Sequence, residues 1–219
     1  MMSDALTRKL GYAFRQPQLL REALTHRSHS TPHNERLEFI GDSILNCATA
    51  IALYQRFANL PEGDLSRLRA NLVNKNVLFE LAQPLGIGDA LRLGEGELKS
   101  GGHRRPSILA DALEAVIGAV YMDGGFEEAA NLVARLLATK LDTVDPKQPG
   151  KDAKTLLQEY LQSKRLPLPK YTIADTRGEA HEQTFRVICE VVELSVSGEA
   201  EGASRRSAEQ GAALLVLEK

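Results

Sequence analysis

Cysteines and long apolar runs are both scarce in this sequence. Two of its 219 residues are cysteine, Cys47 and Cys189, so neither a disulfide framework nor a thiolate zinc site is available. Both stand in apolar stretches, and we expect them to be small core residues. The longest uncharged apolar run covers the eight residues 115–122, whereas a helix that crosses a bilayer needs about 20. We therefore expect no transmembrane helix.

A secretory signal is also missing. The opening segment, MMSDALTRKL, has one acid and two bases where a signal peptide has a basic tip followed by an apolar stretch. We therefore expect a cytoplasmic protein.

An excess of positive charge is absent as well. The chain has 27 Lys and Arg against 29 Asp and Glu, a formal net charge of −2. Residues 1–146 hold 16 basic and 18 acidic side chains, and residues 147–219 hold 11 of each. Nucleic-acid binding is usually accompanied by a basic domain. Any such function must therefore depend here on where individual charges lie.

A polar segment divides the chain into two parts. Residues 141–154 contain two prolines, a glycine and almost nothing apolar, which is typical of a linker. We expect an all-α domain over residues 1–145, a linker at 146–150 and a small α+β domain over 151–219. The order of elements in the second domain is α-β-β-β-α.

The element predictions rest on hydrophobic periodicity. In the first domain the helical period covers residues 19–24, 35–57, 65–82, 107–125 and 126–141. In the second, we expect helices at 153–165 and 204–217 and strands at 170–176, 184–194 and about 195–199.

Three acids fall on one side of the predicted helix 35–57. With about 100° per residue, Glu35, Glu38 and Asp42 lie at about 0°, 300° and 340°, an arc of about 60°. The rest of the circumference is largely apolar. A solvated acidic face would carry Lys or Arg at i+4, and only Arg36 interrupts this one. The acids therefore stand on a helix that is packed on most sides.

A second pair of acids, Asp111 and Glu114, is spaced i, i+3 on an equally apolar helix. If the two helices face each other, they gather Glu38, Asp42, Asp111 and Glu114. Crowded carboxylates have raised pKa values unless a cation compensates them. An all-oxygen ligand set suits Mg²⁺ or Mn²⁺ rather than zinc, and such ions catalyse phosphodiester hydrolysis. The alternative for any one acid is a helix-cap or surface role.

Several segments together resemble bacterial ribonuclease III. NERLEFIGDSIL (34–45) is similar to the signature of that family, and ILADALEAVIGAVYMDGG (108–125) to its second acidic motif. THRSH (25–29), EGDLSRLRANLV (62–73) and LGEGELKSGG (93–102) follow in the order of the family pattern. The resemblance covers essentially the whole chain.

This resemblance implies an endoribonuclease that cuts double-stranded RNA and processes ribosomal and messenger RNA precursors. It further implies Mg²⁺ as the cofactor, with Mn²⁺ able to substitute, no organic cofactor, and products with 5′-phosphate and 3′-hydroxyl ends. The implied metal ligands are Glu38, Asp42, Asp111 and Glu114, of which Asp42 and Glu114 are the expected catalytic residues. A dimeric RNA-binding protein without catalysis is the alternative, but four acids kept on apolar helices favour the enzyme.

The same resemblance implies two further features of the first domain. Glu35 and Glu62 occupy positions in the acidic valley of the family that engage RNA, although a helix-start acid and a turn acid would explain them too. The family is homodimeric through its signature helix, which suits a helix that is apolar nearly all round. Phe39 and Ile40 are the candidates for this contact, and core packing within one subunit is their alternative.

The second domain resembles a double-stranded RNA-binding domain, which reads duplex shape over about 16 base pairs. Arg205 and Arg206 stand at the start of the last predicted helix, where free backbone N–H groups also favour phosphate. Gln158, Glu159 and His181 match family positions that contact the minor groove, and a solvent-exposed turn is the alternative for His181. One departure is Ser207, where the family often has a lysine. This departure should weaken phosphate binding.

Overall fold

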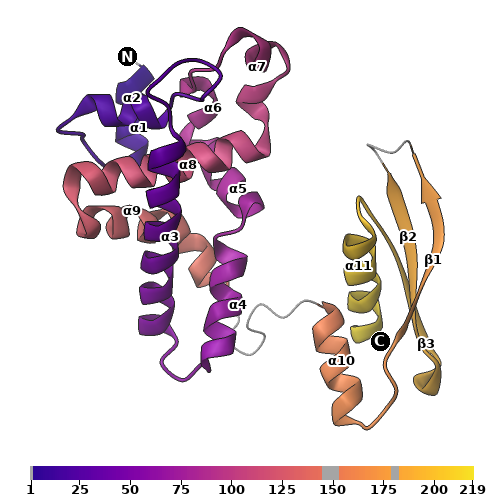
Figure 1. Cartoon of the computed structure of the whole chain (residues 1–219). Coiled ribbons are helices and arrows are strands. Elements are labelled where there is room, and N and C mark those ends of the chain that lie inside the picture. The colour runs from indigo at the N-terminus through magenta and orange to yellow at the C-terminus, as the bar shows by residue number, and fades with distance from the viewer. Residues whose placement is uncertain (1, 145–152, 179–182) are drawn as a thin grey trace. The chain divides into compact units, whose positions relative to one another are not determined.

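The chain forms two compact units, Met1–Gly150 and Lys151–Lys219, which are described separately (Figure 1). The computed structural model describes residues 2–144, 153–178 and 183–219. The predicted linker, 146–150, lies outside the described residues. The first unit is helical and the second combines helices with one sheet, so the predicted fold class is confirmed.

Nine α-helices and one 3₁₀ helix make up the described part of the first unit. They are α1 (Met2–Leu10), α2 (Pro17–Ala23), α3 (Glu35–Arg56), α4 (Glu62–Leu72), α5 (Lys75–Leu85), α6 (Ile87–Ala90), α7 (Glu95–Lys99), η1 (Gly102–Arg104), α8 (Pro106–Gly124) and α9 (Phe126–Asp142). The prediction of one helix over 65–82 is wrong, because α4 and α5 divide it. The side chain of Asn74 accepts hydrogen bonds from the backbone N–H groups of Asn76 and Val77, both at 3.1 Å, and so caps a new helix.

Helix α8 forms the centre of the first unit. Helices α2, α3, α5 and α9 all pack against it, α3 most extensively. From Ala115 to Val120 every residue of α8 is buried. An acid on this helix therefore has little water around it unless it faces an opening.

Two glycines allow α3 and α8 to touch through their backbones. A Cβ atom at Gly41 would lie 1.8 Å from the carbonyl oxygen of Glu114, and one at Gly118 would lie 2.1 Å from that of Leu37. No side chain fits at either position. With glycine at both, the helices approach more closely than any other residues at positions 41 and 118 would permit. The contact brings Glu38 and Asp42 opposite the acids of α8.

One face of α3 is exposed although it is apolar. Phe39 is 77% exposed, Tyr54 73% and Ile51 41%, and Cys47 is exposed on the same helix. The prediction that Cys47 is a core residue is therefore wrong, because its side of α3 faces away from the other helices of this unit. Among the described residues, α3 is also the one helix that could span a membrane by length and composition. That criterion is weak, because core helices of soluble proteins meet it as well.

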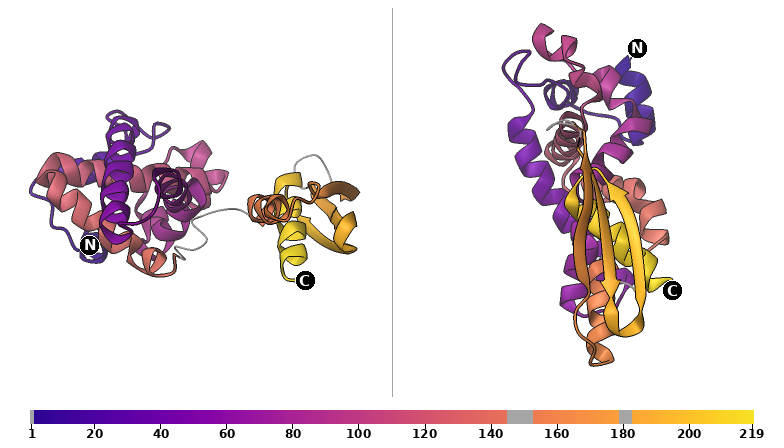
Figure 2. Two further views of the ribbon diagram at one scale, coloured as in Figure 1. Left: turned by 90° about the horizontal axis from the view of Figure 1, so that it is seen from below. Right: turned by 90° about the vertical axis from the view of Figure 1, so that its right-hand side faces the viewer.

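The second unit is a three-stranded antiparallel sheet with two helices on one face (Figure 2). Its elements are α10 (Ala153–Ser163), β1 (Lys170–Arg177), β2 (Thr184–Val191), η2 (Val192–Leu194), β3 (Val196–Gly202) and α11 (Arg205–Leu217). Strand β2 covers residues 184–191 of the predicted strand 184–194, and 192–194 form η2. Along β2 every second residue from Val187 is buried beneath the helices: Val187, Cys189 and Val191. Strand β3 runs three residues further than predicted, with Val187 opposite Ala200.

We expect Gly118→Ala to destabilise the first unit by roughly 3 kcal/mol, because the new methyl group has no space beside the backbone of α3. Thermal unfolding followed by circular dichroism should show a midpoint lowered by roughly 10 °C. Gly96→Ala is the matched control, because nothing lies within 4 Å of its Cβ position. Equal melting temperatures for the two variants would contradict the close backbone contact.

Candidate metal centre

A cleft of about 900 Å³ opens over the crossing of α3 and α8. Helix α3 contributes Glu38 and Asp42 to its lining, and α8 contributes Asp111 and Glu114. The structure thus brings together all four acids predicted as metal ligands. The two helices that carry these acids face each other, as predicted, because their backbones touch at Gly41.

Three of the four acids form a tight group. Glu38, Asp111 and Glu114 each place one carboxylate oxygen within 4.8 Å of the other two, and each is partly buried. Asp42 is exposed beside them, and its Oδ1 accepts a hydrogen bond of 2.9 Å from Nδ2 of Asn46. A hard divalent ion prefers oxygen donors of this kind, so the residues present fit such an ion.

The charges in this cleft repel one another. Burial raises the pKa of Glu114 to about 7, and the charges of Asp42 and Asp111 add to the shift. Burial also raises the pKa of Glu38, with Asp111 as the next cause. A nearby ammonium group, Lys75 Nζ, lies 3.1 Å from Asp111 Oδ1 and lowers both pKa values without cancelling the shifts. The acidic side chains of the cleft therefore carry more negative charge than its basic side chains neutralise.

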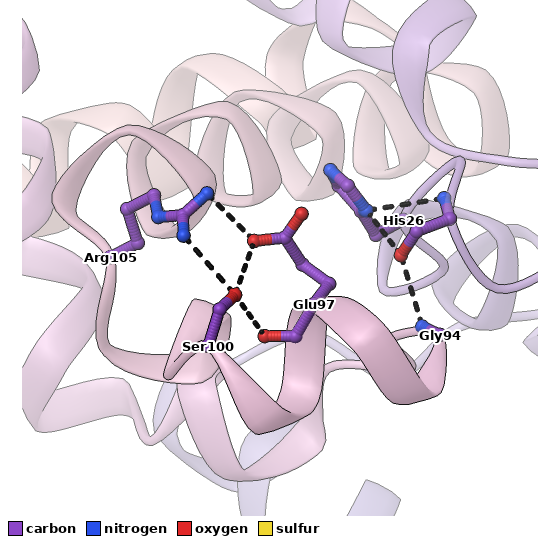
Figure 3. A network of polar contacts seen from close by, with 6 residues as sticks. His26, Gly94, Glu97, Ser100 and Arg105 are labelled. Atoms are coloured by element: carbon purple, nitrogen blue, oxygen red, sulfur yellow. Dashed lines mark hydrogen bonds and ion pairs between the residues drawn. The ribbon is translucent and has the colours of Figure 1, made fainter.

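The rim of the cleft is held by a separate polar network (Figure 3). Arg105 forms an ion pair of 2.7 Å with Glu97, and Ser100 lies between them, 3.3 Å from the Arg105 guanidinium and 3.4 Å from Glu97. On the opposite side, Ser28 accepts a hydrogen bond of 3.0 Å from the backbone N–H of Gly94. The first set of contacts joins α7 to the residue before α8, and the second joins the segment before α3 to Gly94, the residue before α7.

Sequence reasoning missed several residues that line the cleft: His26, Ser28, Lys75, Glu97 and Arg105. His26, Ser28 and Glu97 stand in segments that carry the family resemblance, but nothing in the sequence assigned any of them to the cleft. No sequence signal distinguished Lys75, because the predicted helix 65–82 placed it in a helix interior, whereas the structure places it at the start of α5.

The two further acids of the first unit occupy different places. Glu35 lines the cleft and lies 3.2 Å from Arg27. Glu62 does not line it; this residue begins α4, accepts a hydrogen bond of 2.7 Å from Ser66 and lines a second cleft of about 440 Å³. Within the chain, Glu62 therefore lies on a different cleft from the four acids.

In the second unit the predicted RNA-binding residues lie on the two helices. Gln158 and Glu159 are exposed on α10, and Arg205 and Arg206 are exposed in the first turn of α11. His181 lies outside the described residues. Ser204 caps α11 by accepting a hydrogen bond of 3.1 Å from the backbone N–H of Ser207.

A buried carboxylate, not predicted from the sequence, orients one of these arginines. Glu209 accepts a hydrogen bond of 2.8 Å from Arg205 Nε and one of 2.5 Å from Lys154 Nζ. The hydrogen bond with Lys154, followed by that with Arg205, lowers the pKa of Glu209. Part of the basic charge on this unit is thus neutralised internally.

Comparison with protein families divides the chain in the same way. The model of Ribonuclease-III-like proteins matches residues 16–141, and that of the double-stranded RNA binding motif matches residues 153–219.

Relatives match over nearly the whole length. Ribonuclease 3 of Ralstonia pickettii is 61% identical over 219 residues, which cover 100% of this chain and 86% of that protein. Ribonuclease 3 of Thiobacillus denitrificans is 57% identical over 213 residues, 97% of this chain and 94% of that protein. Among solved structures, the nuclease domain of ribonuclease III from Campylobacter jejuni, described for its region involved in dimer formation, superposes with a TM-score of 0.61 and 42% identity. This match covers 63% of this chain and 97% of that one.

We expect the repulsion at Glu114 to make stability depend on pH in metal-free buffer. The pKa of Glu114 is about 7 in the folded protein against an ordinary value of 4.5, so between these values the folded state holds a proton that the unfolded chain has lost. Stability therefore falls as pH rises through this window. Glu114→Gln lacks the decline and should be more stable than the wild type at pH 8 by about 1–2 kcal/mol, after allowance for solvent screening.

Urea unfolding at pH 4.5 and pH 8 would measure the difference. The advantage of Glu114→Gln should disappear at the lower pH. Glu127→Gln, an exposed acid of the first turn of α9, should show no such change. A pH-independent gap for Glu114→Gln would contradict the assigned repulsion.

Proposed function

Because the chain belongs to the ribonuclease III family and is an endoribonuclease that acts on double-stranded RNA, we propose that it cleaves by divalent-metal catalysis. The proposed ligands are Glu38, Asp42, Asp111 and Glu114, and the proposed ion is Mg²⁺. The observation that carries this proposal is the group of three carboxylate oxygens within 4.8 Å of one another. Mn²⁺ would substitute, because both ions accept oxygen ligands.

The four acids would have different roles, because their surroundings differ. When bound, the ion would lower the pKa of a water molecule and would stabilise negative charge on the phosphodiester oxygens. Glu114, whose pKa is raised to about 7 chiefly by burial, would hold the ion from the buried side of the cleft. Asp42 is exposed and is oriented by Asn46, so it would face the incoming strand. The proposed products have 5′-phosphate and 3′-hydroxyl ends.

The second unit would hold the RNA duplex. In this proposal Arg205 and Arg206 bind phosphates at the start of α11, where the free N–H groups of the helix add to their charge. Gln158 and Glu159 on α10, together with His181, would contact the minor groove. This division is supported by the match of residues 153–219 to the double-stranded RNA binding motif.

We further propose that the enzyme is a homodimer with α3 at the contact. Phe39 is the better of the two predicted contact residues, because Ile40 packs inside its own subunit against Gly118. The second cleft is lined by Ile51, Tyr54 and Leu65 and has the size and apolar character to accept Phe39 of the partner subunit. Glu62 also lines that cleft, so this contact would carry Glu62 towards the partner's acidic cleft. The proposed RNA-engaging role of Glu35 and Glu62 would then require the dimer.

The proposed setting is the cytoplasm, with precursors of ribosomal and messenger RNA as substrates. It involves neither a membrane nor an organic cofactor. The alternative of a non-catalytic RNA-binding protein is not favoured, because the full-length relatives are ribonucleases.

We expect Glu114→Gln and Asp42→Asn to lower the cleavage rate of a long RNA duplex in Mg²⁺ by roughly 10³-fold or more, since metal stabilisation of the transition state supplies several kcal/mol. Duplex affinity in EDTA should change by no more than about threefold, because the second unit retains its contacts. Gel assays of cleavage and binding test both statements. Glu127→Gln serves as the control and should cleave normally. Parallel loss of binding and cleavage would refute the division of labour.

We expect Phe39→Ala to weaken the dimer by roughly 10²- to 10⁴-fold, because a two-fold contact loses two large aromatic side chains, each worth about 1.5–3 kcal/mol. Sedimentation equilibrium at several protein concentrations would measure the dissociation constant. Leu98→Ala, an apolar residue that is 54% exposed on α7, should leave it unchanged. A monomeric wild-type protein would disprove the proposed assembly.

A further inference from the structure

We propose that Lys75 is the counter-ion of the acidic cleft in the metal-free enzyme. Its ammonium group pairs with the carboxylate of Asp111 and competes with the divalent ion for it. The competition sets the ion concentration at which the cleft fills. This inference rests on the proposed metal site.

The position of Lys75 is not explained by its own helix. Lys75 is the first residue of α5, directly after the capping residue Asn74. The amino end of a helix has a partial positive charge, and a cation there is unfavourable. The lysine therefore gains its stabilisation elsewhere.

The partner of Lys75 belongs to α8. Its Nζ lies 3.1 Å from Asp111 Oδ1, and the two side chains are 67% and 29% exposed. The hydrogen bond to Asp111 is the largest cause of a raised pKa for Lys75, and the charges of Glu114 and Glu38 also contribute. One ammonium group is thus coupled to all three carboxylates of the tight group.

Other basic side chains on the cleft have partners outside that group. Arg27 pairs with Glu35 at 3.2 Å, and Arg105 pairs with Glu97 at 2.7 Å. Lys75 consequently differs from them in neutralising a proposed metal ligand directly.

A divalent ion cannot use Asp111 without encountering this ammonium group. An ion shared by Glu38, Asp111 and Glu114 would come close to Lys75 Nζ, and like charges at about 4 Å repel strongly enough near a protein surface to change an affinity at least tenfold. The stem of Lys75 is mostly exposed, so the ammonium group can move into water when the ion arrives. The lysine therefore opposes metal binding without blocking it.

The test is isothermal titration of the full-length, RNA-free protein with Mn²⁺. Lys75→Gln should bind Mn²⁺ about tenfold more tightly than the wild type, and Lys75→Arg, which keeps the charge, should stay close to the wild type. Lys140→Gln is the matched control, because Lys140 forms an interhelical ion pair of 2.6 Å with Glu80 away from the cleft. The Mg²⁺ concentration at half-maximal cleavage should fall in the same order.

A second readout is thermal unfolding in EDTA. Lys75→Gln should melt below the wild type because the acids lose their counter-ion, and saturating Mn²⁺ should remove the difference. Equal or weaker Mn²⁺ binding by Lys75→Gln would overturn the inference while leaving the metal site intact. If Glu114→Gln bound Mn²⁺ as tightly as the wild type, the proposed metal site would be wrong, and the inference with it.

Discussion

The backbone contact between α3 and α8 is the constraint on which the site depends. Gly41 and Gly118 remove the side chains that would hold the two helices apart. Glu38 and Asp42 flank Gly41 on one helix, while Glu114 precedes Gly118 by one turn on the other. A wider crossing would leave the same acids on separate surfaces. The glycines thus determine how close the carboxylate oxygens come, although neither glycine has any chemistry of its own.

This proximity has an electrostatic cost that the apolar packing must offset. The raised pKa values of Glu114 and Glu38 show that burial and mutual repulsion disfavour their charged forms. Functional sites often oppose stability in this way, and the buried face of α8 provides the excess packing that tolerates it.

Much of the fold and part of the site could be predicted from hydrophobic periodicity and acid spacing. Helices 35–57 and 107–125 were recognisable, and with them the four acids, because each pattern is local. The contacts of Lys75 and the position of Glu62 were not, since they depend on how segments far apart in the chain meet. Asn74 was missed as a cap because an asparagine between two apolar helical turns resembles a helix interior. Cys47 was misassigned because an apolar sequence pattern does not reveal which apolar helix faces are covered within the unit and which stay exposed.

Helix α3 illustrates why that last distinction is hard. One face packs on α8, a second carries Glu38 and Asp42, and a third exposes Phe39 and Tyr54. These faces together make the helix apolar nearly all round, so the usual amphipathic signal disappears. Neighbouring residues point about 100° apart, which is why Ile40 belongs to the core while Phe39 does not. Because one rigid helix connects the exposed apolar face to the acids, any contact that positions this face also positions the proposed metal ligands.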